Sequence, residues 1–282
     1  MKKAREKLPK IEVESPKEAR KELPKKQRWN WPTFWFVVFI VAWVFVSVVV
    51  AQILVGNLMV WTLGAERVVQ PVWSGIYSVL SYGLALASIM FVPPLLARSW
   101  KVSTTINHKR VVWKGDGKSL EPRRKELGLT GSPTWTDIGL APIGYIVATL
   151  MAAALVWVFN LFPWFNASEA QQTGFNYYIF GVDRVIAFVV LVILAPIVEE
   201  VIFRGWLYGK LRARLSAPLS ILIVSALFGL IHFQWNVGVN VFALSVVLCV
   251  MREITGTIYA GILTHMIKNG VAFYLLYVMM IG

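Results

Sequence analysis

Residues 215–251 read LSAPLSILIVSALFGLIHFQWNVGVNVFALSVVLCVM, and none of these 37 residues is Asp, Glu, Lys or Arg. A helix that crosses the hydrocarbon core of a bilayer needs about 20 mostly apolar residues. The run is therefore long enough for two crossings, and its polar segment Gln234–Asn240 marks where the chain turns between them. This stretch predicts that the protein is built from membrane-spanning helices.

The rest of the chain repeats this pattern. Of its 282 residues, 57% are hydrophobic and 15% are charged, whereas soluble domains carry about 25% charged residues. This composition argues against a soluble enzyme, a disordered chain and a nucleic-acid-binding domain. We expect an all-α fold, a polytopic membrane helix bundle with about seven spans. The apolar runs place these spans near residues 33–58, 72–97, 138–163, 183–203, 215–233, 239–255 and 257–281, and Pro93-Pro94 should kink or end the second.

The net charge of +13 is concentrated in two polar segments. Residues 1–29 and residues 98–126 each carry a charge of +6, and the remaining chain is nearly balanced. Lys and Arg accumulate in the cytoplasmic loops of membrane proteins. The pattern therefore predicts a multi-pass protein of the cell membrane with a cytoplasmic N-terminus, a cytoplasmic 98–137 loop and an external C-terminus. Residues 1–29 mix Lys, Glu and Pro, which is typical of a disordered tail.

Ionisable residues gather inside the predicted spans of the C-terminal half. The fourth span ends with Pro-Ile-Val-Glu-Glu-Val-Ile-Phe-Arg-Gly at residues 196–205. The fifth contains Phe-Gly-Leu-Ile-His at residues 228–232, and the last contains His-Met-Ile-Lys-Asn at residues 265–269. Such residues are costly within a bilayer and are candidates for function. The single cysteine, Cys249, lies in an apolar run and provides neither a disulfide framework nor a Cys-based metal site.

Helical geometry separates the two adjacent carboxylates. Residues four apart share a helix face, whereas neighbours point about 100° apart. Glu200 and Arg204 can therefore form an ion pair, whereas the fourth neighbour of Glu199 is Phe203. Glu199 must find its partner on another helix, and a carboxylate in such a setting is suited to general acid–base work. His265 and Asn269 are also four apart, so both can present donors to one cavity.

Structural interpretations compete with these roles residue by residue. Glu199 alone fits a capped carboxylate at the edge of the lipid, and His232 alone fits an interhelical hydrogen bond. Lys268 is expected to snorkel or to line a wet cavity. A count of about 1.5 Å per residue places Glu199 near the cytoplasmic end of its span and His232 deep in the next one. The two can meet if the fourth helix is displaced outward, or if the fifth begins below the bilayer surface, as the helix-like segment 201–215 favours.

At these motifs the sequence resembles the CAAX-protease and bacteriocin-processing family of intramembrane glutamic endopeptidases. That family shares a Glu-Glu-x-x-x-Arg motif, then Phe-x-x-x-His, then His-x-x-x-Asn, on successive hydrophobic segments. The counterparts here occur in the same order, and the resemblance covers about residues 180–275. They are Glu199-Glu200 with Arg204, Phe228 with His232, and His265 with Asn269.

The resemblance implies peptide hydrolysis without a covalent intermediate. It makes Glu199 and His232 the residues that activate a water, and His265 and Asn269 the residues that stabilise the oxyanion. Glu200, Arg204 and Phe228 become supporting residues. The implied fold has its catalytic core in the C-terminal four spans, and the implied partners are the lipid bilayer and a peptide or protein substrate, membrane-anchored or a precursor. We expect no nucleic acid partner.

The resemblance implies no cofactor, but zinc is an alternative. A catalytic zinc site takes three protein ligands, and Glu199, His232 and His265 could supply that number. The chain lacks the His-Glu-x-x-His helix motif, however. Two further classes stay open: a non-catalytic immunity or scaffold protein of the same fold, and a proton-coupled transporter. The expected organisation is a tail (1–29), two spans with a basic loop (30–137) and a membrane-embedded protease core (138–282).

Overall fold

The computed structural model describes residues 31–96, 102–106, 109–113 and 121–280. The tail predicted for residues 1–29 lies outside these described residues. The elements are α2 (Trp31–Leu63), α3 (Ala65–Val68), α4 (Pro71–Leu96), β1 (Val102–Ile106), β2 (Lys109–Trp113), α5 (Glu121–Glu126), α6 (Trp135–Phe159), α7 (Gly181–Phe188), η1 (Val189–Leu194), α8 (Ala195–Glu200), η2 (Val201–Leu207), α9 (Tyr208–Arg212), α10 (Ala217–Leu230), α11 (Trp235–Thr255), α12 (Tyr259–Phe273) and η3 (Tyr274–Val278).

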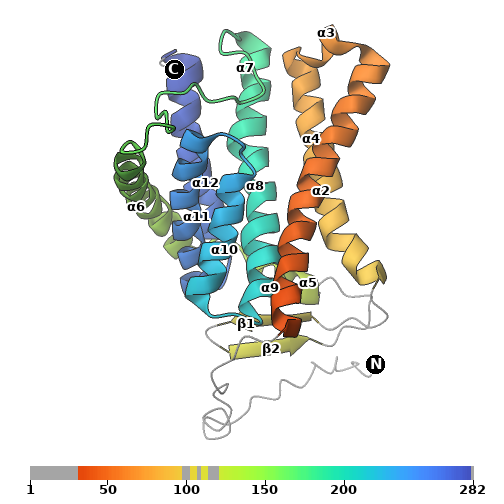
Figure 1. Ribbon diagram of the computed structural model, residues 1–282, viewed down its shortest axis with the longest axis vertical. Helices are drawn as coiled ribbons and strands as arrows, with labels where there is room; N and C mark the ends of the chain where they lie inside the picture. The colour runs from red at the N-terminus through yellow and green to blue at the C-terminus, as the bar shows by residue number, and fades with distance from the viewer. Residues whose placement is uncertain (1–30, 97–101, 107–108, 114–120, 281–282) are drawn as a thin grey trace, which may run out of the picture.

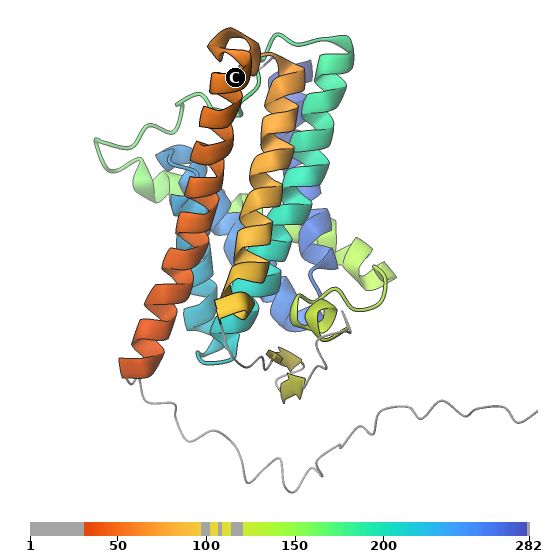
Figure 2. The same cartoon turned by 90° about the vertical axis from the view of Figure 1, so that its right-hand side faces the viewer.

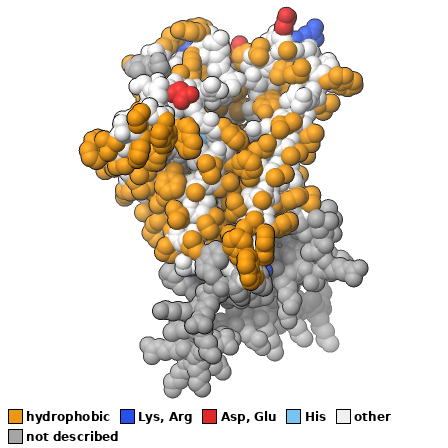
Figure 3. Space-filling view, viewed as in Figure 1, with side chains coloured by type: hydrophobic (Ala, Val, Ile, Leu, Met, Phe, Trp, Pro, Cys, Tyr) orange, Lys and Arg blue, Asp and Glu red, His pale blue; other side chains and the backbone are white. Residues whose placement is uncertain are grey.

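Within the described residues, five helices are long and apolar enough to cross a membrane. They are Thr33–Leu63, Pro71–Val92, Trp135–Phe159, Gly181–Arg212 and Trp235–Thr255. The other two predicted spans correspond to α10, with 14 residues, and to α12, with 15 residues followed by the π-helical η3. The face of the bundle in Figure 3 is dominated by hydrophobic side chains. The prediction of an all-α, multi-pass membrane bundle is confirmed, but α10 is shorter than the crossing expected at 215–233.

A single long helix runs through the middle of the bundle. It begins at Gly181, ends at Arg212 and contains the π-helical segments η1 and η2. Figure 1 and Figure 2 show the α2–α4 hairpin on one side of this helix and α6, α10, α11 and α12 on the other. The central helix therefore contacts elements from both the N-terminal and the C-terminal half of the chain.

The central helix is longer than the predicted span 183–203, and its extension to Arg212 agrees with the helix-like pattern of residues 201–215. Glu199 lies near the end of the predicted span, and 13 further helical residues, or about 20 Å of helix, follow it in the structure. The helix continues because its basic residues are paired: Arg204 with Glu200, Lys210 with Glu126, and Arg212 with Glu253. Arg204 and Lys210 therefore lie within the helix, and Arg212 is its last residue.

The turn that carries His232 is held by close packing of α10 on α11. A Cβ atom on Gly229 would lie 2.9 Å from the Gly238 carbonyl oxygen, and one on Gly238 would lie 3.0 Å from the Gly229 oxygen. Glycine at both positions lets the two backbones touch. Phe233 follows His232 with a φ of 52°, a left-handed conformation that is uncommon outside glycine. His232 thus lies just beyond the end of α10. The length of chain from the start of α10 to His232 is similar to that from Glu199 to the end of the central helix at Arg212, so the two residues lie at similar heights in the bundle.

The basic loop contains structure that the apolar pattern did not predict. Strand β1 pairs with β2 in an antiparallel hairpin in which Val102 lies opposite Trp113. Beyond the hairpin, the segment around Leu127 packs against the central helix, where a Cβ atom on Gly205 would lie 3.0 Å from the Leu127 carbonyl oxygen. The following helix, α6, begins with a capping box, because Thr134 and Asp137 satisfy each other's backbone amides.

Candidate active site

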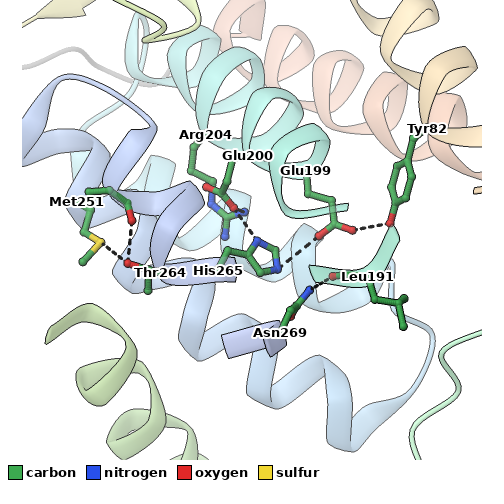
Figure 4. A network of polar contacts seen from close by, with 10 residues as sticks. Tyr82, Leu191, Glu199, Glu200, Arg204, Met251, Thr264, His265 and Asn269 are labelled. Carbon is green, nitrogen blue, oxygen red and sulfur yellow. Dashed lines mark hydrogen bonds and ion pairs between the residues drawn. The ribbon is translucent and has the colours of Figure 1, made fainter. Parts of the chain in front are cut away.

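Glu199 and Glu200 lie near the middle of the central helix, on a short α-helical segment between two π-helical ones. α8 ends at Glu200, η1 precedes it and η2 follows it. A π-helical turn changes the direction in which the following side chains point, and such turns occur frequently at functional sites. Within this segment neighbouring residues point about 100° apart, so the two carboxylates point in different directions, as Figure 4 shows.

Glu200 is fully enclosed. Its Oε1 atom accepts a hydrogen bond from Arg204 Nη1 at 2.8 Å, and neither side chain is exposed. The same oxygen accepts a second hydrogen bond from His265 Nδ1 at 3.0 Å. A Cβ atom on Gly261 would lie 3.1 Å from Glu200 Oε2, so α12 passes directly over this carboxylate. The predicted Glu200–Arg204 pair is confirmed, and His265 is an additional partner.

Glu199 lies on the more open side of the helix. Its side chain is 14% exposed, and Oε1 accepts a hydrogen bond of 2.8 Å from the Tyr82 hydroxyl on α4. Oε2 lies 3.8 Å from His265 Nε2 on α12. The partners of Glu199 are therefore on other helices, as helical spacing requires.

His265 stands between the two carboxylates. Because a carboxylate oxygen accepts, His265 Nδ1 donates to Glu200, and this bond fixes the orientation of the ring. Nε2 then points towards Glu199. The His265 side chain is 3% exposed. This contact between the third motif and Glu200 was not expected from the sequence.

His232 is oriented in a similar way from the end of α10. Its Nδ1 donates to the Phe228 carbonyl oxygen at 2.7 Å, so the neutral ring keeps a lone pair on Nε2. The ring interacts electrostatically with Glu199. In both histidines the Nδ1 atom is held by the protein, which leaves Nε2 for chemistry.

The Phe228 ring packs between the three motifs. The Arg204 guanidinium lies over it, 4.3 Å from the ring centroid. The rings of His232 and His265 meet it edge to face at centroid distances of 5.1 and 5.9 Å. The phenylalanine therefore keeps the two histidines apart and covers the buried cation.

Asn269 faces the central helix at a different point from His265. Its Nδ2 atom donates to the Leu191 carbonyl oxygen in η1 at 2.8 Å. An amide NH₂ group has two donors, so one of them remains for another acceptor. The neighbouring Lys268 is partly buried and interacts electrostatically with Glu199. The structure thus brings Glu199, Glu200, Arg204, Phe228, His232, His265 and Asn269 around one stretch of the central helix.

Tyr82 is the member of the site that sequence reasoning missed. It lies 117 residues before Glu199, within an apolar run that carries no recognised motif. A tyrosine in such a run is an ordinary packing or membrane-interface residue, so its type gave no signal. A catalytic zinc ion would need three protein ligands around one point. Among the residues described, no group of three His, Cys, Asp or Glu side chains is arranged to hold a metal ion.

The comparisons with known proteins concern the segment just described. Residues 181–271, about a third of the chain, match the family described as "Type II CAAX prenyl endopeptidase Rce1-like". This match confirms the resemblance over the segment that carries all three motifs, and the family is one of proteases. No curated protein and no solved structure matches the chain.

Proposed function

We propose that this protein is an intramembrane endopeptidase that hydrolyses a peptide bond with a water activated by Glu199 and His232. Its substrate is a membrane-associated protein or a peptide precursor, and residues 138–282 form the protease core. The observation that carries the proposal is the difference in environment between two adjacent carboxylates. Glu200 is buried in an ion pair with Arg204, whereas Glu199 is partly exposed and faces His265.

Glu199 and His232 supply the base. Water loses a proton as its oxygen attacks the peptide carbonyl carbon, and both Glu199 and the Nε2 lone pair of His232 can accept that proton. The tetrahedral intermediate then collapses, the C–N bond breaks, and the leaving amine takes the proton from the same groups. No covalent bond to the enzyme is needed, and the match to an endopeptidase family supports this reaction class.

His265 and Asn269 stabilise the oxyanion. Asn269 has a second amide N–H beyond the one bonded to Leu191. His265 Nδ1 is engaged with Glu200, so Nε2 donates to an oxyanion when the ring carries both protons. Fixed donors of this kind stabilise charge that develops in the transition state.

Two other functions would use the same fold differently. A non-catalytic immunity or scaffold protein would need neither an oriented His232 nor a partly exposed Glu199. A zinc protease would recruit Glu199, His232 and His265 as ligands and would need another base, for which Glu200 is unsuited because it is paired with Arg204.

The test is cleavage of labelled peptides, free and lipid-anchored, by the purified protein in lipid vesicles. The wild type should cleave, and Glu199→Gln should be inactive yet folded. Glu169→Gln should behave as wild type because the Glu169 side chain is exposed on the loop between α6 and α7. No cleavage of any peptide by the wild type would favour the scaffold function.

A chelation experiment decides the mechanism class. For the glutamic mechanism, activity should survive dialysis against a strong chelator, and elemental analysis should find well under one metal ion per chain. Stoichiometric zinc whose removal abolishes cleavage and whose return restores it would make the protein a zinc protease.

A further inference from the structure

The site receives one side chain from the N-terminal half of the chain. The Tyr82 hydroxyl donates to Glu199 Oε1 at 2.8 Å, and the two residues come from α4 and α8. Tyr82 lies outside the segment 181–271 that matches the endopeptidase family. The α2–α4 hairpin therefore does more than cover the central helix with apolar surface: it contributes a polar contact to the proposed base.

Close packing holds α4 in the position that this contact requires. A Cβ atom on Gly75 would lie 2.9 Å from the Ile186 side chain, so α4 approaches the central helix closely at this glycine. Tyr82 follows Gly75 by seven residues, which is about two helical turns and returns to the same face. The face of α4 that packs against the central helix is thus the face that carries Tyr82 towards Glu199, as Figure 4 shows for the two side chains.

The hydroxyl distinguishes between the two carboxylate oxygens. Tyr82 occupies Oε1, whereas Oε2 points towards His265 Nε2 at 3.8 Å. A glutamate side chain has several rotatable bonds, and a bond at Oε1 restricts their rotation. Oε2 is then the oxygen left to accept a proton from water, and its direction is set before substrate binds.

We propose that Tyr82 is a positioning residue that orients Glu199 for water activation through its hydroxyl. The proposal rests on the proposed endopeptidase function and extends that site to α4. It differs from a packing role, because packing depends on the aromatic ring whereas positioning depends on the hydroxyl. Tyr82→Phe separates the two, since it keeps the ring and removes the donor.

The experiment compares Tyr82→Phe with Tyr77→Phe in the peptide-cleavage assay. Tyr77 lies on the same helix, but its hydroxyl faces the Gln52 carbonyl oxygen at 3.5 Å in an exposed position. Hydrogen bonds to charged groups are the stronger ones in proteins, so kcat of Tyr82→Phe should fall about 10- to 100-fold. KM should stay within about twofold of the wild-type value, and Tyr77→Phe should match the wild type in both constants.

A double-mutant cycle shows whether Tyr82 acts through Glu199. Glu199→Asp shortens the side chain by one methylene and withdraws the carboxylate from Tyr82, so Tyr82→Phe should have little further effect on kcat in that background. Equal losses in both backgrounds, or a kcat of Tyr82→Phe within twofold of the wild type, would overturn the positioning role.

The failure of this proposal is distinct from the failure of the proposed function. If the wild type cleaves, Glu199→Gln is inactive and Tyr82→Phe is fully active, the endopeptidase stands and Tyr82 is a packing residue. If the wild type cleaves nothing, the endopeptidase function and the positioning role built on it both fall. In each case thermal unfolding of Tyr82→Phe and Tyr77→Phe verifies that the variants are folded.

Discussion

Glu199 and Glu200 are neighbours in the chain, but they belong to two different regions of the molecule. The Glu200 region, formed by Glu200, Arg204 and Gly261, is closed: both charged side chains have no exposed surface, and a helix lies over the carboxylate. The Glu199 region, formed by Glu199 and Tyr82, is partly open, and its hydrogen bond reaches across to another helix. The same residue type thus has two environments one residue apart.

The difference teaches how one helix can serve both stability and chemistry. A buried carboxylate with a cationic partner has its charge compensated and has no access to water, and Glu200 links the central helix to α12 through its bond with His265. A carboxylate that is partly exposed and held by a neutral donor keeps an oxygen for reaction. His265 links the two regions, because Nδ1 is bonded in the Glu200 region and Nε2 faces the Glu199 region.

Replacing each histidine is the strongest test of this division. His232→Ala and His265→Ala should both abolish peptide cleavage, since each removes a proposed catalytic group. Their effects on stability should differ: His265→Ala deprives the buried Glu200 of a donor and should cost about 1.5–3 kcal/mol in the free energy of unfolding. His232 is partly exposed at a helix end, so His232→Ala should cost less. Equal destabilisation by the two variants, measured by thermal unfolding, would contradict the linking role of His265.

Much of this arrangement follows from local rules in the sequence. Apolar runs predict the bundle, and the four-residue spacing of Glu200 and Arg204 predicts their ion pair. The same spacing predicts that Glu199 finds its partners on other helices. These predictions depend on helix geometry alone, which is why they hold without knowledge of the tertiary structure.

The remaining features depend on contacts between distant residues. The partners of the basic residues after Glu199 are one example: Arg204, Lys210 and Arg212 have the pattern of the polar end of a span, whereas each is paired with a carboxylate in the structure. Two of those carboxylates, Glu126 and Glu253, lie more than 40 residues away in the chain. Tyr82 was missed for the same reason, since one sequence has no local rule that pairs residues on α4 and α8.

Removing the charge of Glu200 tests the closed region directly. Glu200→Gln leaves Arg204 fully buried without its counter-charge, and breaking a buried ion pair costs about 3–5 kcal/mol. We expect a correspondingly lower free energy of unfolding in detergent or vesicles. The double variant Glu200→Gln/Arg204→Gln should recover part of the loss, because no unpaired charge remains. If Glu200→Gln were fully stable but inactive while Glu199→Gln kept activity, the two carboxylates would have the opposite roles.

Asn269 tests whether the proposed site extends along α12 beyond His265. Asn269 lies one turn after His265, and its amide donates to the Leu191 carbonyl oxygen in η1. Loss of one oxyanion donor lowers kcat by about 100- to 1,000-fold, so Asn269→Ala should slow cleavage by that factor with little change in KM. Asn240→Ala is the control, since that amide bonds a backbone oxygen in α11. A decrease of less than about threefold would remove Asn269 from the site.

The smallest effect is expected from adding one methyl group over Glu200. A Cβ atom on Gly261 would lie 3.1 Å from Glu200 Oε2, closer than ordinary contact, whereas one on Gly270 would lie 3.6 Å from a Val192 methyl group. Within a helix, Ala gives a free energy of unfolding about 0.5–1 kcal/mol higher than Gly does. Gly270→Ala should therefore be neutral or stabilising. Gly261→Ala should instead lose about 1–3 kcal/mol, because Glu200 cannot move without disturbing Arg204 and His265. Equal stability of the two variants in thermal unfolding would mean that the Glu200 region has room to adjust and is less closed than its contacts indicate.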